Sequence, residues 1–162
     1  MTVTYSAFEV FEIAEQIERN GAKFYRAAAE LASDSLVRGI FLQLAEWEIR
    51  HEKLFARMKR DNVGLSRQPG TAKAEELLPD PKAMAGLAVF TIGPVPGEEL
   101  RGGRTVADIL MTAVKKERDT IVFYKGLKDF ISAGAEQDKI DEIIKEEMRH
   151  VTILERLLNK TD

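Results

Sequence analysis

The sequence predicts an all-α protein, a bundle of four helices made of two similar helical hairpins joined by a long connection. All five prolines and seven of the eleven glycines fall within residues 61–104. The flanking stretches place apolar residues at alternating spacings of three and four, which is typical of the buried face of a helix. A set of residues also recurs at an offset of 99 positions. We therefore expect residues 1–162 to form one domain, with residues 61–104 as the crossover between antiparallel hairpins.

The first hairpin is expected to contain helices over residues 6–32 and 35–60. Ser6 and Glu9 have the spacing of a capping box, and Ser33 or Asp34 can cap the second helix. The apolar seam of the first helix consists of Val10, Ala14, Ile17, Gly21, Phe24, Ala28 and Leu31. The seam of the second consists of Val37, Phe41, Leu44, Glu48, His51, Phe55 and Met58.

The second hairpin is expected to contain helices over residues 105–132 and 136–159. Thr105 and Asp108 form a capping-box pattern, and Gly134 can end the first of these helices. Its seam consists of Ile109, Ala113, Lys116, Thr120, Phe123, Leu127 and Phe130. The seam of the last helix consists of Ile140, Ile143, Glu147, His150, Leu154 and Leu157.

The only two histidines each end a Glu-x-x-His motif, Glu48 to His51 and Glu147 to His150, and both motifs lie within an apolar seam. Burying such groups costs several kcal/mol unless something compensates them. Two divalent cations would balance four glutamates and two neutral imidazoles. A polar network satisfied by protein groups alone is the alternative.

The repeat selects the remaining ligands. The candidates in the first helix are Glu12, Glu15 and Glu18. At the offset of 99, Glu12 aligns with Met111 and Glu15 with Val114, and of the three only Glu18 aligns with an acid, Glu117. The same comparison removes Glu146, which aligns with Trp47. The predicted metal ligands are therefore Glu18, Glu48, His51, Glu117, Glu147 and His150.

Composition limits the chemistry and the partners. Carboxylates with imidazole suit iron or manganese, and zinc also binds such sites. The chain has no cysteine, so a redox reaction would need electrons from an external donor. A net charge of -3 is too balanced to indicate a nucleic-acid or membrane partner. Residues 1–10 lack the basic and apolar segments of an export signal, and no apolar run approaches the roughly 20 residues of a membrane span, so we expect a cytoplasmic protein.

The pattern Glu-x-x-Gly-x-x-Phe-Tyr over residues 18–25, the two Glu-x-x-His motifs and the long crossover resemble the ferritin-like di-iron superfamily, specifically its rubrerythrin-like branch. The resemblance covers the chain apart from residues 61–104. It implies a ferritin-like fold and two iron ions bridged by Glu48 and Glu147. Glu18 and His51 would complete the shell of one ion, and Glu117 and His150 that of the other.

The resemblance also implies an oxidoreductase that reduces peroxide or oxygen. Full-length rubrerythrins carry a cysteine-ligated domain as internal electron donor, and an extra glutamate one turn after the ligand of the third helix. This chain lacks cysteine and has Thr120 at the second position. Two other functions stay open: a ferroxidase subunit of an iron-storage cage, and a non-catalytic bundle that metal holds together.

Three other features each allow two interpretations. The hydroxyls of Tyr25 and Tyr124 can bind ligand carboxylates, or the rings can simply pack in the core. Trp47 can pack or relay electrons. The apolar segment of residues 84–92 can cover the bundle or form a homodimer contact.

Overall fold

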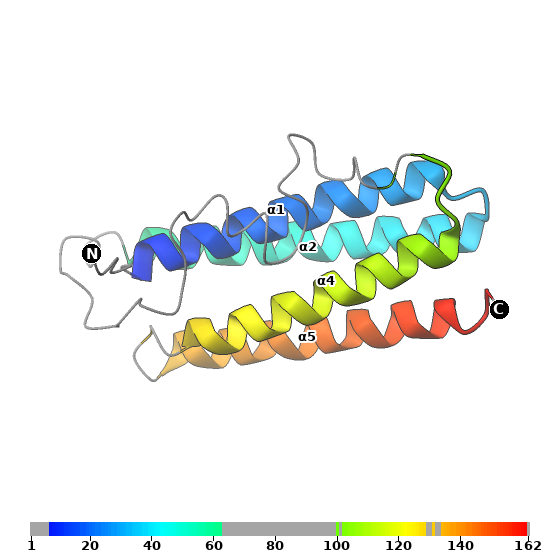
Figure 1. Ribbon diagram of the computed structural model, residues 1–162. Helices are drawn as coiled ribbons and strands as arrows, with labels where there is room; N and C mark the ends of the chain where they lie inside the picture. The colour runs from blue at the N-terminus through cyan, green and yellow to red at the C-terminus, as the bar shows by residue number, and fades with distance from the viewer. Residues whose placement is uncertain (1–6, 63–99, 101, 129–130, 132–133, 162) are drawn as a thin grey trace, which may run out of the picture.

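The computed structural model describes residues 7–62, 100, 102–128, 131 and 134–161, and these form a bundle of helices (Figure 1). The helices are α1 (Ala7–Leu31), α2 (Ser35–Asp61), α4 (Val106–Leu127) and α5 (Ala135–Leu158). The predicted all-α architecture of two hairpins and a long middle connection is confirmed. None of these four helices is long and apolar enough to cross a membrane.

The order of the helices explains the long connection. α1 packs mainly on α2, and α4 packs mainly on α5; α1 also contacts α4, and α2 contacts α5. α2 and α4 run in the same direction, so α2 ends at the end of the bundle opposite to the one where α4 begins (Figure 1). The chain must therefore travel the length of the bundle between them, which a tight turn cannot do.

The helix starts follow the predicted capping residues. Asp34 accepts hydrogen bonds from the backbone amides of Leu36 and Val37 at 2.9 Å each, and so caps α2. Thr105 and Asp108 form the predicted capping box of α4. The predicted cap at Ser6 lies outside the described residues. These side chains satisfy amide groups that the first turn of a helix leaves without partners.

The predicted end of the third helix, at residue 132, is wrong. α4 ends at Leu127. The side-chain amide of Gln137, in the first turn of α5, donates to the carbonyl oxygens of Lys128 at 3.0 Å and Ile131 at 2.8 Å. Gly134 precedes α5 with φ of 141°, a conformation that side chains with a Cβ rarely adopt. Gln137 thus gives carbonyl groups beyond the end of α4 a partner in α5.

The core contains the predicted seams with few exceptions. The seams of α2 and α5 are buried throughout. Leu31 was predicted to be buried but is 51% exposed, because it is the last residue of α1. Lys116 is only partly buried, with its Nζ atom 5.8 Å from the centre of the Phe24 ring. Phe130 lies outside the described residues. α1 buries more than its seam, since Phe11 and Tyr25 are also fully buried.

Replacing Asp34 by alanine tests the cap of α2. The change should lower the free energy of unfolding by about 1 kcal/mol, because two backbone amides lose their acceptor. Asp34→Asn keeps a side-chain oxygen and should retain most of the stability. Urea denaturation of the three proteins measures the difference. Equal losses in both variants would show that the charge of Asp34, rather than its hydrogen bonds, stabilises the helix.

Candidate metal centre

All six predicted ligands meet in the interior of the bundle. α1 supplies Glu18, α4 supplies Glu117, and α2 and α5 each supply a Glu-x-x-His pair. A spacing of three places the carboxylate and imidazole of each pair on one face of the helix. None of the six residues is more than 4% exposed. The site is therefore a set of polar groups enclosed by apolar packing.

The ligand atoms form two overlapping groups. One contains Glu18, Glu48, His51 and Glu147, and the other contains Glu48, Glu117, Glu147 and His150. Within each group, one atom from each residue lies within 4.8 Å of the others. Glu48 and Glu147 belong to both groups. We name the two halves the Glu18–His51 position and the Glu117–His150 position.

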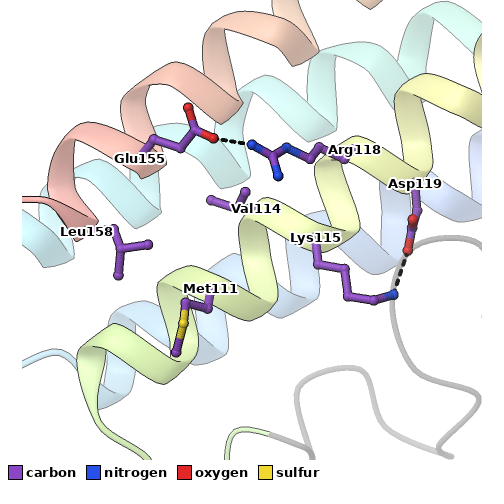
Figure 2. A pocket seen from close by; sticks show the side chains of 7 residues that line it. All are labelled: Met111, Val114, Lys115, Arg118, Asp119, Glu155 and Leu158. Atoms are coloured by element: carbon purple, nitrogen blue, oxygen red, sulfur yellow. Dashed lines mark hydrogen bonds and ion pairs between the residues drawn. The ribbon is translucent and has the colours of Figure 1, made fainter.

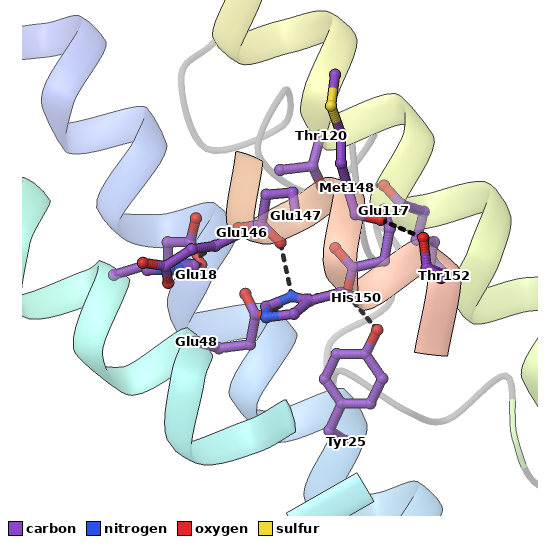
Figure 3. Close-up of polar contacts among 12 residues, drawn as sticks. Glu18, Tyr25, Glu48, Glu117, Thr120, Glu146, Glu147, Met148, His150 and Thr152 are labelled. Atoms are coloured by element: carbon purple, nitrogen blue, oxygen red, sulfur yellow. Dashed lines mark hydrogen bonds and ion pairs between the residues drawn. The ribbon is translucent and has the colours of Figure 1, made fainter. Parts of the chain in front are cut away.

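Each histidine directs Nδ1 towards the carboxylates. His51 Nδ1 lies 2.9 Å from Glu147 Oε1 and 3.5 Å from Glu18 Oε2. His150 Nδ1 lies 2.8 Å from Glu147 Oε2 and 3.2 Å from Glu48 Oε1. Glu147 therefore offers one oxygen to each imidazole. Figure 3 shows its contact with His150. The two oxygens of Glu147 thus face different histidines.

The buried atoms that lack a hydrogen bond show that these residues fit metal ions. Among the described residues, the buried side-chain atoms without a hydrogen-bond partner are Glu18 Oε2, Glu48 Oε1, His51 Nδ1, Glu147 Oε1, Glu147 Oε2 and His150 Nδ1. All six belong to the two groups. Native proteins rarely leave such atoms unsatisfied, and oxygen with imidazole nitrogen is a donor set for iron, manganese or zinc. The site is a buried carboxylate and histidine site that could hold two metal ions.

Two tyrosines hold the outer carboxylates across the hairpins. Tyr25 on α1 donates a hydrogen bond to Oε1 of Glu117 on α4, and Tyr124 on α4 donates one to Oε1 of Glu18 on α1. Figure 3 shows the Tyr25 hydroxyl directed at Glu117. Both tyrosines are fully buried, so they pack in the core and also orient the carboxylates. Both interpretations from the sequence therefore apply.

Burial and crowding shift the acid–base behaviour of the centre. Burial, together with the negative charge of Glu147, raises the pKa of Glu117 to about 7. Burial and neighbouring carboxylates also raise the pKa of Glu48 well above its usual range. Burial opposes the charging of His150, but the interactions with Glu147 and Glu117 together outweigh it and raise the pKa of His150 to about 10. Without metal, the site therefore holds protons in order to reduce its charge.

The repeat comparison missed one contact of the centre. Glu146 Oε2 lies 2.7 Å from His51 Nε2, the ring nitrogen that faces away from the carboxylates. Glu146 belongs to neither ligand group, so its exclusion as a ligand agrees with the geometry. Its aligned residue, Trp47, instead stacks on His150 with 5.1 Å between ring centres. The sequence did contain a signal for this contact, because Glu146 directly precedes Glu147, which belongs to both ligand groups.

A surface hollow between α4 and α5 offers different chemistry (Figure 2). Its lining is Met111, Val114, Lys115, Arg118, Asp119, Glu155 and Leu158. The charged side chains are paired, Arg118 with Glu155 and Lys115 with Asp119. No histidine is present to join these acids. The hollow is therefore separate from the centre and lacks its ligand set.

Comparisons with known proteins identify the fold. No protein-family model matches the chain, and no curated protein matches it. A solved structure of a ferritin-like diiron-carboxylate protein from Thermotoga maritima superposes with a TM-score of 0.73, at 23% identity over 100% of both chains. A hypothetical protein from Pyrococcus furiosus superposes with a TM-score of 0.71. The two chains are 20% identical, and the match covers 96% of this chain and 89% of the other. The manganese catalase KatB from Anabaena PCC7120 superposes with a TM-score of 0.65. The two chains are 11% identical, and the match covers 99% of this chain and 76% of the catalase.

The fold and the centre together define the class of protein. The chain has the ferritin-like fold of two helix pairs with a long middle connection. It encloses a carboxylate and histidine site whose two ligand groups could hold two ions.

Stability of the metal-free protein should rise as pH falls from 8 to 5.5. Glu117 has a raised folded-state pKa of about 7 against an ordinary 4.5, so its stabilising contribution is complete below 4.5 and lost as pH rises through 7. His150 acts in the same direction: its pKa is raised from an ordinary 6.5 to about 10, so its stabilising contribution is lost as pH rises between these values. Glu147 has a lowered pKa and opposes them only below its ordinary 4.5.

Thermal denaturation of chelator-treated and metal-loaded protein at both pH values measures this effect. Metal should raise the melting temperature most at pH 8 and least at pH 5.5, since protons compete with metal for the ligands. Superimposable curves with and without metal would mean that the carboxylates are open to water.

Proposed function

We propose that the protein is a di-iron oxidoreductase, similar to rubrerythrins, that reduces peroxide or oxygen with electrons from an external donor. One observation carries the proposal: two buried ligand groups share Glu48 and Glu147, so two ions would lie next to each other. Glu18 and His51 would complete the shell of one, and Glu117 and His150 that of the other. Manganese and zinc are alternative occupants of the same ligands.

The chain's own residues prepare the centre. Two ferrous ions held there would supply the two electrons that reduce one hydrogen peroxide, with two protons, to two waters. Tyr25 and Tyr124 hold Glu117 and Glu18 in place through their hydroxyl protons. Phe41 and Phe55, both fully buried, help to exclude water from the carboxylates. Because the chain has no cysteine, the electrons must return from another molecule.

Two other functions use the same ligands. An iron-storage subunit would oxidise iron as its substrate and would assemble into a cage. A non-catalytic bundle would bind metal only for stability. Reactivity with oxidants separates the non-catalytic bundle from the others, and the assembly state separates storage from a peroxide- or oxygen-reducing enzyme.

The centre should bind two ions per chain. Anaerobically iron-loaded protein should give close to two irons by elemental analysis, and Glu48→Ala or Glu147→Ala should lose both, because each residue belongs to both ligand groups. Glu46→Ala is the matched control, since Glu46 is exposed on the same helix as Glu48. One iron per chain, with unchanged binding in both alanine variants, would exclude a binuclear centre.

The iron-loaded protein should react with hydrogen peroxide or oxygen within seconds, giving the near-ultraviolet absorption of oxidised iron in stopped-flow measurements. Glu18→Ala and His150→Ala should each slow this reaction by about tenfold or more, because each removes a ligand from one ion. Glu12→Ala is the control, since Glu12 is exposed on α1. A reaction no faster than that of free ferrous iron would leave the non-catalytic bundle as the better account.

A further inference from the structure

The two positions of the centre have matching ligands but different supports. Glu48 and Glu147 belong to both ligand groups, and a tyrosine hydrogen bond holds the outer glutamate of each group. The residue that precedes each shared glutamate differs, because the repeat aligns Glu146 with Trp47. Glu146 contacts His51, and Trp47 contacts His150. This pair breaks the symmetry next to the ligands.

Glu146 determines which tautomer His51 adopts when it binds metal. Nδ1 faces the carboxylates, so it must carry the free lone pair if it binds metal. The proton then resides on Nε2, which donates to Glu146 Oε2 at 2.7 Å. A carboxylate at the far nitrogen of a metal-binding histidine holds the ring in place and increases its electron density. Its negative charge also attracts a cation at the Glu18–His51 position.

Within the described part of the chain, no carboxylate supports His150 in the same way. Its ring stacks with the ring of Trp47, at an interplanar angle of 9°, and with the ring of His51, at 20°. Its ion pairs to Glu48, Glu117 and Glu147 all use Nδ1. Among the described residues, none accepts a hydrogen bond from its Nε2. An indole orients the ring by packing, but it brings neither an acceptor nor a charge.

We propose that Glu146 makes the Glu18–His51 position the tighter of the two, so that divalent ions fill the centre in a fixed order, with the Glu117–His150 position second. The inference rests on the proposed binuclear centre and adds a difference in metal affinity between its two positions. Glu146 acts as a positioning residue, through His51. The second ion would then be the more easily exchanged one.

Calorimetric titration with Mn²⁺ tests the order. Wild-type protein should bind two ions in two resolved steps, and Glu146→Gln should weaken the tighter step by about tenfold. Glutamine keeps an oxygen that can accept from Nε2, so the change isolates the charge. Glu142→Gln is the matched control: Glu142 lies one turn earlier on α5, is exposed and makes no contact with either histidine among the described residues.

Single-position variants locate the effect. His150→Ala leaves the Glu18–His51 position intact, and His51→Ala leaves the Glu117–His150 position. Mn²⁺ should bind more tightly to the first variant. Adding Glu146→Gln should weaken binding about tenfold in His150→Ala and leave His51→Ala unchanged, because the partner ring is absent there. Melting curves of all variants confirm that they fold.

Other outcomes overturn the inference in distinguishable ways. Two equal binding steps in the wild type would exclude unequal positions, while two bound ions would still support the proposed centre. An equal loss from Glu146→Gln in both histidine variants would show only a general charge effect and would overturn the role of Glu146. Failure of the wild type to bind Mn²⁺, Fe²⁺ and Zn²⁺ would overturn the proposed function itself.

Discussion

The burial of four carboxylates and two imidazoles at one level of the bundle is the constraint on which the rest of the structure depends. Removing each charged group from water costs several kcal/mol. Tyr25, Tyr124 and Glu146 form hydrogen bonds with three of the six residues, and the inward-facing atoms remain without hydrogen-bond partners. Each helix must therefore present its ligand at the same height, because a shift by one turn would bury a carboxylate against apolar side chains.

This constraint also links the two hairpins. Packing is most extensive within each hairpin, between α1 and α2 and between α4 and α5. The hydrogen bonds of Tyr25 and Tyr124 run between α1 and α4, and the two glutamates that belong to both ligand groups come from α2 and α5. Metal binding at the centre would therefore stabilise the contact between the hairpins, and not only the helices that carry the ligands.

Much of this could be predicted from the sequence because two local signals agree. Periodicity placed each Glu-x-x-His pair on a buried face, and the repeat selected Glu18 from three nearby acids. Contacts between helices were harder to predict. The spacing of Tyr25 from Glu18 indicated a nearby carboxylate but could not show that it belongs to Glu117, because that depends on how the hairpins dock. The hydrogen bonds of Gln137 to carbonyl groups beyond the end of α4 are another such contact.

Ligands were selected by comparing the two copies of the repeat, and this explains why the contact of Glu146 was not predicted. A duplicated hairpin gives two equal ligand sets, and a comparison of the copies retains what they share. A residue that makes the copies different is removed by the same comparison, as Glu146 was. Thr120 is another such residue: it is buried, its hydroxyl donates to the carbonyl of Lys116, and its aligned partner is Gly21. In a duplicated centre, equal chemistry comes from the positions that repeat, and a difference between the ions must come from the neighbours that do not.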